Sequence, residues 1–148
     1  MFTHVFLGAQ DLEASRKFYD AALGALGHAP GAGAGSRYVY RTPTGTFGIT
    51  TPINGESASF GNGSTFGFAA KSEAEVHAFH AAGVANGGVS CEDPPGLRTN
   101  PSFSYYIAYL RDPSGNKIAR CTVTPDASLA ALRWHDANGR QWPRPPIA

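Results

Sequence analysis

The chain carries little charge for its length, and the two signs nearly cancel. Among its 148 residues, 12 are Lys or Arg and 11 are Asp or Glu, so the formal net charge is +1. Recognition of a polyanion needs a surface field of one sign. We therefore expect neither nucleic acid nor a membrane as a partner.

Cysteines and long apolar runs are also scarce. Cys91 and Cys121 are the two cysteines, too few for a disulfide framework and too isolated for a zinc cluster. No stretch approaches the roughly 20 apolar residues that span a bilayer, and the N-terminus lacks the pattern of a secretory signal. The glycine-rich stretch 31–37 has no following helix or lysine of a phosphate-binding loop, so it is predicted to be a plain loop. We expect a reduced, cytoplasmic protein.

Glycine and proline are abundant instead, and the chain repeats itself. Eighteen glycines and eleven prolines predict many turns in a β-rich domain. Residues 1–8 read as a strand, followed by a helix that Asp11 caps and Gly27 ends. A second strand, within 64–70, precedes a helix that begins after Ser72, with Glu75 completing a capping box. The two segments superpose at a shift of 61 residues, which places Thr65 on His4.

The repeat continues into a pair of hairpins. The sequence YRTPTGTFGI (40–49) has the pattern of LRDPSGNKIA (110–119). In each copy a proline presets the turn and a glycine closes it. We expect a first strand–helix–strands module over 1–54, a linker over 55–61, a second module over 62–123 and a C-terminal extension over 124–148, with a short helix at 128–134. The extension belongs to neither module, and the whole forms one structural domain.

These residues carry a resemblance to a family. The segment HVFLGAQDLEASRKFYDAALGALG, followed about ninety residues later by YYIAYLRDPSGNKIARC, resembles the vicinal oxygen chelate superfamily, which includes glyoxalase I, bleomycin resistance proteins and extradiol dioxygenases. The resemblance covers roughly residues 1–123. It implies an α+β fold in which two βαβββ modules form a curved mixed sheet around a central cup, and usually a homodimer.

In that family, side chains from the first and last strands of the modules hold a divalent metal. At these positions the resemblance places His4, Thr65, Ala119 and a residue near Ile49 or Thr50. Only His4 is a usual ligand, whereas catalytic sites need about three protein ligands. We expect a degenerate metal site and no cofactor, unless ligands come from other positions.

Several side chains are candidates for a pocket, each with a structural alternative. His4 is either a core histidine or a polar group that acts as base or donor near neutral pH. Tyr105 and Tyr109 share one strand face and either line the cup or fill the core. Arg98 either binds a carboxylate or phosphate or is solvated in its loop. Cys121, on the strand face of Lys117 and Ala119, is either a reactive thiol or a buried inert one. His77 and His80 are either metal ligands or helix surface.

Three functions remain open. The first is a small-molecule binding protein, with a largely apolar or aromatic ligand held by His4, Thr65, Arg98, Tyr105, Tyr109 and Ala119. The second is a lyase or isomerase related to glyoxalase I, with His4 and Tyr109 as candidate catalytic residues. The third and weakest is an extradiol-type dioxygenase, because iron would need two histidines and one carboxylate.

Overall fold

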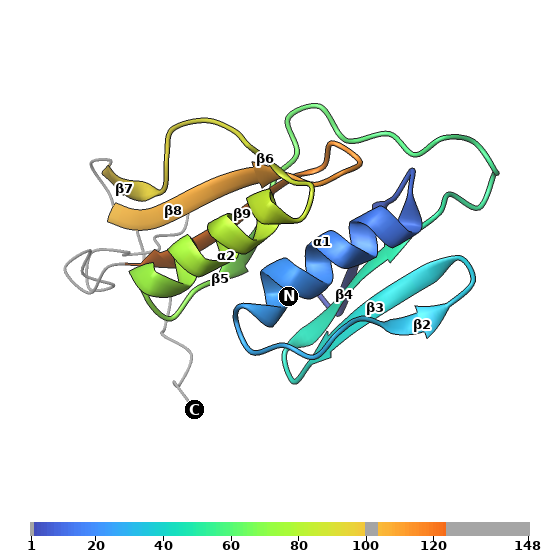
Figure 1. Ribbon diagram of the computed structural model, residues 1–148, viewed down its shortest axis with the longest axis horizontal. Helices are drawn as coiled ribbons and strands as arrows, with labels where there is room; N and C mark the ends of the chain where they lie inside the picture. Colours follow the sequence, from blue (N-terminus) through green and yellow to red (C-terminus); the bar gives the residue numbers. More distant parts are fainter. Residues whose placement is uncertain (1, 100–103, 124–148) are drawn as a thin grey trace, which may run out of the picture.

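The computed structural model describes residues 2–99 and 104–123 as two strand–helix–strand modules, each with its own sheet (Figure 1). The predicted C-terminal helix at 128–134 lies outside the described residues. The elements of the first module are β1 (His4–Gly8), α1 (Leu12–Gly24), β2 (Ala32–Ala34), β3 (Arg37–Thr42) and β4 (Gly45–Thr50). Those of the second are β5 (Phe66–Ala69), α2 (Glu73–Ala85), β6 (Val89–Ser90), β7 (Gly96–Thr99), β8 (Ser104–Arg111) and β9 (Lys117–Val123).

The two sheets follow the same plan. In the first sheet the order is β1-β4-β3-β2, and in the second it is β5-β9-β8-β6, with β7 also paired to β8. In both, the strand before the helix pairs in parallel with the last strand of its module, β1 with β4 and β5 with β9. The predicted α+β class with two βαβββ modules is confirmed.

Both helices begin where the capping residues predict. The Asp11 side chain accepts a hydrogen bond from the Ala14 backbone N–H at 2.9 Å, and the Ser72 hydroxyl accepts one from the Glu75 N–H at 3.3 Å. The bounds of α1 and α2 differ by 61 residues at each end, as the repeat predicts. The expectation of a plain loop over residues 31–37 was wrong, because these residues contain β2.

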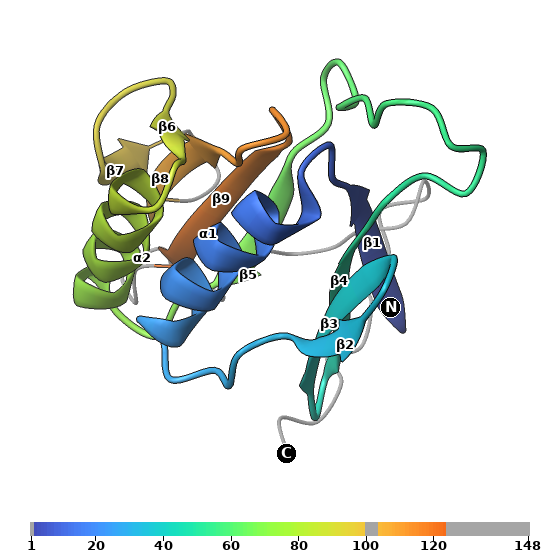
Figure 2. The same ribbon diagram turned by 45° about the vertical axis from the view of Figure 1, so that its right-hand side comes forward.

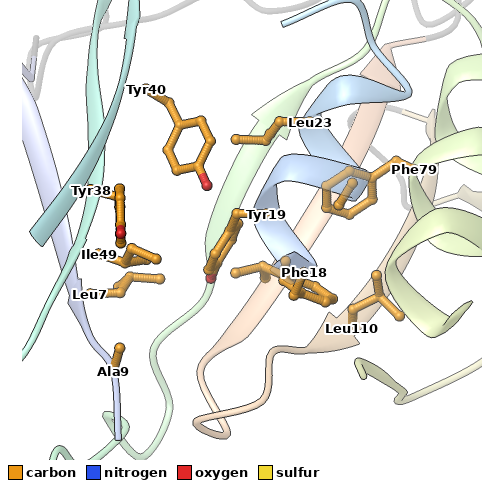
Figure 3. Packing of buried hydrophobic residues seen from close by; sticks show 12 residues of the cluster. Leu7, Ala9, Phe18, Tyr19, Leu23, Tyr38, Tyr40, Ile49, Phe79 and Leu110 are labelled. Atoms are coloured by element: carbon orange, nitrogen blue, oxygen red, sulfur yellow. The ribbon is translucent and has the colours of Figure 1, made fainter. Parts of the chain in front are cut away.

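The core lies between the modules rather than inside each one. Figure 2 shows α1 between the strands of the first sheet and α2. In Figure 3, Tyr19 of α1 lies near side chains of the first sheet, whereas Phe18 lies near Leu110 of β8 and the side chain of Phe79 from α2. The cluster of buried apolar residues comprises Leu7, Ala9, Phe18, Tyr19, Ala22, Leu23, Tyr38, Tyr40, Ile49, Phe79, Leu110 and Ile118. One core therefore joins the two modules.

The β8–β9 turn contributes the polar contacts between the two modules. Asp112 is buried, and its carboxylate accepts hydrogen bonds from the Tyr19 hydroxyl at 2.8 Å and from the backbone N–H groups of Ser114 and Asn116 at 2.9 Å each. The Asn116 amide donates to Asp112 and also to the Gly8 carbonyl, both at 2.9 Å. Burial, then the nearby Asp112, raise the pKa of Tyr19 well above its ordinary value. The turn of the second module is thus fastened to β1 and α1 of the first.

Glu75 links the start of α2 to β9 and should make stability depend on acid pH. Its carboxylate accepts from the Lys71 backbone N–H at 2.9 Å and from the buried Arg120 guanidinium at 2.8 Å, and these contacts lower its pKa. The stabilisation is present above the pKa of an unfolded glutamate, about 4.3, and is lost as the pH falls through the lower folded value.

Glu75→Gln should therefore flatten the acid limb of a plot of unfolding free energy against pH, as measured by urea denaturation. Glu73→Gln is the matched control, because Glu73 is exposed in the same helical turn and the described residues offer it no side-chain partner. Equal acid limbs for wild type and Glu75→Gln would contradict this role.

Candidate functional site

Each sheet packs one face against the helices, and we call the opposite face its open face, although Ile107 and Ala119 on that face of the second sheet are nearly buried. In β3, Tyr38 and Tyr40 are buried in the core, so the alternating Arg37, Val39 and Arg41 are on the opposite face. In β9, Ile118 is buried in the core, and Ala119 therefore faces the other way. Because both buried faces meet the shared core, both open faces point away from it (Figure 2). The candidate site consists of these two open faces.

The open face of the first sheet is a shallow hollow of about 570 Å³. Its lining residues are Thr3, His4, Phe6, Ala32, Gly33, Arg37, Val39, Arg41 and Thr46. The ring of Phe6 covers Gly48 on the neighbouring strand, where an added Cβ would come within 2.3 Å of that ring. His4 is exposed here, and its ring meets the Phe6 ring edge-on with centroids 6.1 Å apart. His4 is therefore a surface group of the hollow and not a core histidine.

The second sheet's open face holds most of the other predicted residues. The strand register puts Ala119 between Gly67 and Tyr109, and pairs Arg98 with Tyr105. Paired residues share a face, so the side chains of Tyr105, Tyr109, Arg98 and Ala119 are on one side of the sheet. Thr65, just before β5, lines a smaller hollow of about 140 Å³ beside Lys117 at the end of this face. Five of the six predicted residues thus lie on or beside this face, whereas His4 is on the other sheet of the same chain.

A charged contact that sequence reasoning missed lies beside Tyr109. The Lys117 ammonium is 4.7 Å from the centre of the Tyr109 ring and forms an ion pair with Glu92. Glu92 has φ 61°, an unusual left-handed conformation for a residue other than glycine. Burial raises the pKa of Tyr109, and Tyr105 and Glu92 add to the effect. Tyr109 therefore keeps its proton at neutral pH and shares a side-chain hydrogen bond with Tyr105.

Arg98 lies in strand β7 and not in the loop where it was predicted, and its side chain is held by the segment just before this strand. Its guanidinium donates to the Pro94 carbonyl at 2.8 Å and to the Leu97 carbonyl at 3.2 Å, and lies 4.0 Å from the Asp93 carboxylate. These contacts favour a structural role, in which Arg98 fixes the segment before β7, although the side chain is on the same face as Tyr105.

The remaining polar candidates show no chemical activation. Burial raises the pKa of the Cys121 and Cys91 thiols, so both stay protonated at neutral pH. His77 bonds to the Tyr106 hydroxyl at 2.7 Å and His80 to the Ser90 hydroxyl at 2.8 Å. Each of these two histidines connects α2 to the second sheet through a different hydroxyl group, whereas the two ligands of a metal ion would converge on the ion.

One predicted position needs correction. The counterpart of Ala119 in the first module was placed near Ile49 or Thr50, but Ile49 is fully buried in the core. The register pairs Phe6 with Gly48 and Gly67 with Ala119, and Phe6 and Gly67 correspond under the 61-residue shift. Gly48 is therefore the counterpart. The second hairpin has one more residue than the first between its arginine and the residue on the return strand that pairs with this arginine. The additional residue displaces the alignment of the two return strands by one position.

The four family positions therefore offer very little to a metal. They carry the His4 imidazole, the Thr65 hydroxyl, the Ala119 methyl group and, at Gly48, only a hydrogen beneath the Phe6 ring. Within residues 2–99 and 104–123 no three His, Cys, Asp or Glu side chains come together as a metal site would require. A residue set with one usual ligand does not fit a catalytic zinc, iron or manganese ion.

Comparison with known proteins identifies the family. The family model of the Glyoxalase/Bleomycin resistance protein/Dioxygenase superfamily matches residues 2–119. The chain belongs to this superfamily.

Solved structures agree with this assignment. A glyoxalase/bleomycin resistance protein from Albidiferax ferrireducens T118 is 61% identical, with a TM-score of 0.80 over 82% of this chain and 98% of that one. A glyoxalase-related enzyme from Fulvimarina pelagi shares the fold at 21% identity, with a TM-score of 0.65 and 96% of each chain covered. Lactoylglutathione lyase from Agrobacterium tumefaciens does so at 19% identity, with a TM-score of 0.58 over 82% of this chain and 92% of that one. No curated protein matches the chain.

Proposed function

We propose that the protein binds a small molecule in a cup that two chains of a homodimer build together. The carrying observation is the orientation of the sheets, since both open faces point away from the shared core and neither can close over the other within one chain. A ligand pocket buries most of its ligand's surface, which a single open sheet cannot do. The first-module face of one chain would therefore lie opposite the second-module face of its partner.

The contents of the two faces suit a small, partly aromatic ligand. The first face supplies the Phe6 ring and the His4 imidazole, and the second supplies Tyr105 and Tyr109, with the small, nearly buried Ala119 next to Tyr109 and with Thr65 at a small hollow. The aromatic rings would bury the ligand body, and the Tyr109 hydroxyl would form a hydrogen bond that fixes its orientation. The two free cysteines are compatible with the reducing cytoplasm in which we place the protein.

Binding without a metal cofactor is the function that these residues support best. The Phe6 ring over Gly48 and the Ala119 methyl group occupy places where the family's metal chemistry would need ligand atoms. A metal-free lyase or isomerase is the second candidate, and it is favoured by one observation: a shared cup would bring His4 of one chain toward Tyr109 of the other. There the imidazole would act as base and the tyrosine as acid. An extradiol dioxygenase would need a second histidine and a carboxylate for iron, and the part of the first face that the structure describes has neither.

Metal analysis of the purified protein tests this proposal. After incubation with manganese, nickel, zinc or iron and removal of free ions, we expect far less than one metal per chain, with no difference between wild type and His4→Ala. Aromatic metabolites and antibiotics screened by thermal shift should include compounds that raise the melting temperature, because a ligand that binds only the native state stabilises it. Near-stoichiometric metal that is lost in His4→Ala would instead establish a metalloenzyme.

A further inference from the structure

Two arginines on the first open face stand apart from the other described arginines. Arg16 pairs with Asp20 at 3.4 Å and Arg120 pairs with Glu75 at 2.8 Å. Arg37 and Arg41 have no hydrogen-bond or ion-pair partner within residues 2–99 and 104–123 and are exposed on the sheet. Their guanidinium groups are therefore available to a molecule that enters the hollow.

The strand register places Arg41 in a polar row that crosses three strands. His4 of β1 pairs with Thr46 of β4, which pairs in turn with Arg41 of β3. Neighbouring strands are about 4.8 Å apart, so the backbones of His4 and Arg41 are about 10 Å apart with Thr46 between them, a separation that their longer side chains can bridge toward one small group. The Thr3 hydroxyl lies 2.9 Å from Nδ1 of His4. When that hydroxyl donates to Nδ1, the His4 hydrogen is on Nε2, which can then donate to a ligand.

The next row along the sheet is apolar. Phe6 pairs with Gly48, which pairs with Val39, and the Phe6 ring covers Gly48. Arg37 follows on the far side, four residues from Arg41 along the same strand, or about 13 Å in an extended chain. Among the described residues that line the hollow there is no Asp or Glu. The electrostatic potential in the hollow is therefore positive. Hydrogen-bond donors lie at one end of the hollow, and apolar side chains form its floor next to them.

We propose that this end of the hollow binds an oxyanion, the carboxylate or phosphate group of the ligand, through Arg41, His4 and Thr46. The inference rests on the proposed function and adds a ligand class to it. A guanidinium matches the geometry of a carboxylate or phosphate with two parallel hydrogen bonds, and the hydroxyl and the imidazole N–H add further donors. The ligand body extends from the anion over Phe6 and Val39, while Arg37 raises the attraction for negative charge.

Matched probes test this proposal on the full-length protein. Benzoate and phenyl phosphate carry the anion, and benzamide has the shape of benzoate without its charge. Isothermal titration calorimetry should show at least one of the two anions binding about tenfold or more tightly than benzamide, as one charge-assisted contact implies. The advantage should shrink as the salt concentration rises.

Substitutions test whether Arg41 causes the preference for the anion. Arg41→Gln should abolish the preference for the anion, Arg41→Lys should retain part of it, and Lys17→Gln, which removes the same charge from the exposed surface of α1, should leave it unchanged. Melting temperatures verify that all three variants are folded.

The outcomes separate this inference from the proposed function. Equal affinity for benzoate, phenyl phosphate and benzamide would overturn the anion site but leave small-molecule binding in place. The site would also be refuted by an anion preference that survives in Arg41→Gln. If no anion binds although neutral compounds from the thermal-shift screen do, the inference alone fails. If neither anionic nor neutral compounds bind, the proposed function fails with it.

Discussion

Asp112→Ala should lower the free energy of unfolding by about 3–5 kcal/mol, because it leaves several buried hydrogen-bond donors without their acceptor. The carboxylate accepts four hydrogen bonds, from the Tyr19 hydroxyl, two backbone N–H groups and the Asn116 amide. Without it these donors lose their acceptor inside the joint between the modules, and each unsatisfied group costs about 1–3 kcal/mol. For a chain of this size the melting temperature should fall by about 10 °C.

Two further variants show whether the effect belongs to the carboxylate. Asp112→Asn keeps one acceptor oxygen and should cost about 1–3 kcal/mol. Asp93→Ala removes an aspartate that is 84% exposed and 4.0 Å from Arg98, and should change stability by less than about 0.5 kcal/mol. Urea denaturation measures all three. A loss in Asp112→Ala no larger than in Asp93→Ala would show that the turn does not hold the modules together.

Mixed dimers of two blocked chains should regain ligand binding that neither chain has by itself. Val39→Trp fills the first open face, and Gly67→Trp fills the second, where an added Cβ would meet nothing within 4 Å. If each cup combines the first face of one chain with the second face of the other, both cups are blocked in either homodimer. In the mixed dimer one cup contains both tryptophans and the other contains none.

The measurement is a calorimetric titration with a compound from the thermal-shift screen, on dimers purified with two different affinity tags. The expected capacity is half that of the wild type at unchanged affinity. Gly24→Trp, on the exposed surface of α1 with nothing within 4 Å of the added Cβ, should keep full capacity. A mixed dimer that binds nothing would place the whole cup within one chain.

Local chemistry made much of the fold predictable. Asp11 and Ser72 each provide an oxygen for a free helical N–H, and the apolar stripes of both helices follow helical spacing, so α1 and α2 could be placed from the sequence. Tyr105 was placed with Tyr109, and Ala119 with Lys117, from the alternation of strand side chains, and the register shows that these two pairs share one face of the sheet. These features depend on residues close in the chain or on a regular period.

What could not be predicted depends on register and on long-range packing. One additional residue in the second hairpin moves the counterpart of Ala119 from Ile49 to Gly48 and turns it from the core to the open face. The separation of His4 from the tyrosines depends on how the helices pack between the sheets, which no local pattern encodes. The contact of Glu92 with Lys117 arises from a left-handed backbone conformation in a loop that the sequence does not mark with glycine.

The fastening of the β8–β9 turn to β1 also has a consequence for synthesis on the ribosome. Gly8 and Asn116 are 108 residues apart, and Gln10 and Ser114 are 104 apart, yet each pair is joined by a hydrogen bond of 2.9 Å. The parallel partner of β5 is β9, the last described strand. Since such distant contacts form slowly and late, a nascent chain would expose the apolar side of α1 until its C-terminal hairpin emerges. Cellular chaperones would therefore have access to this exposed apolar surface before the two modules pack together.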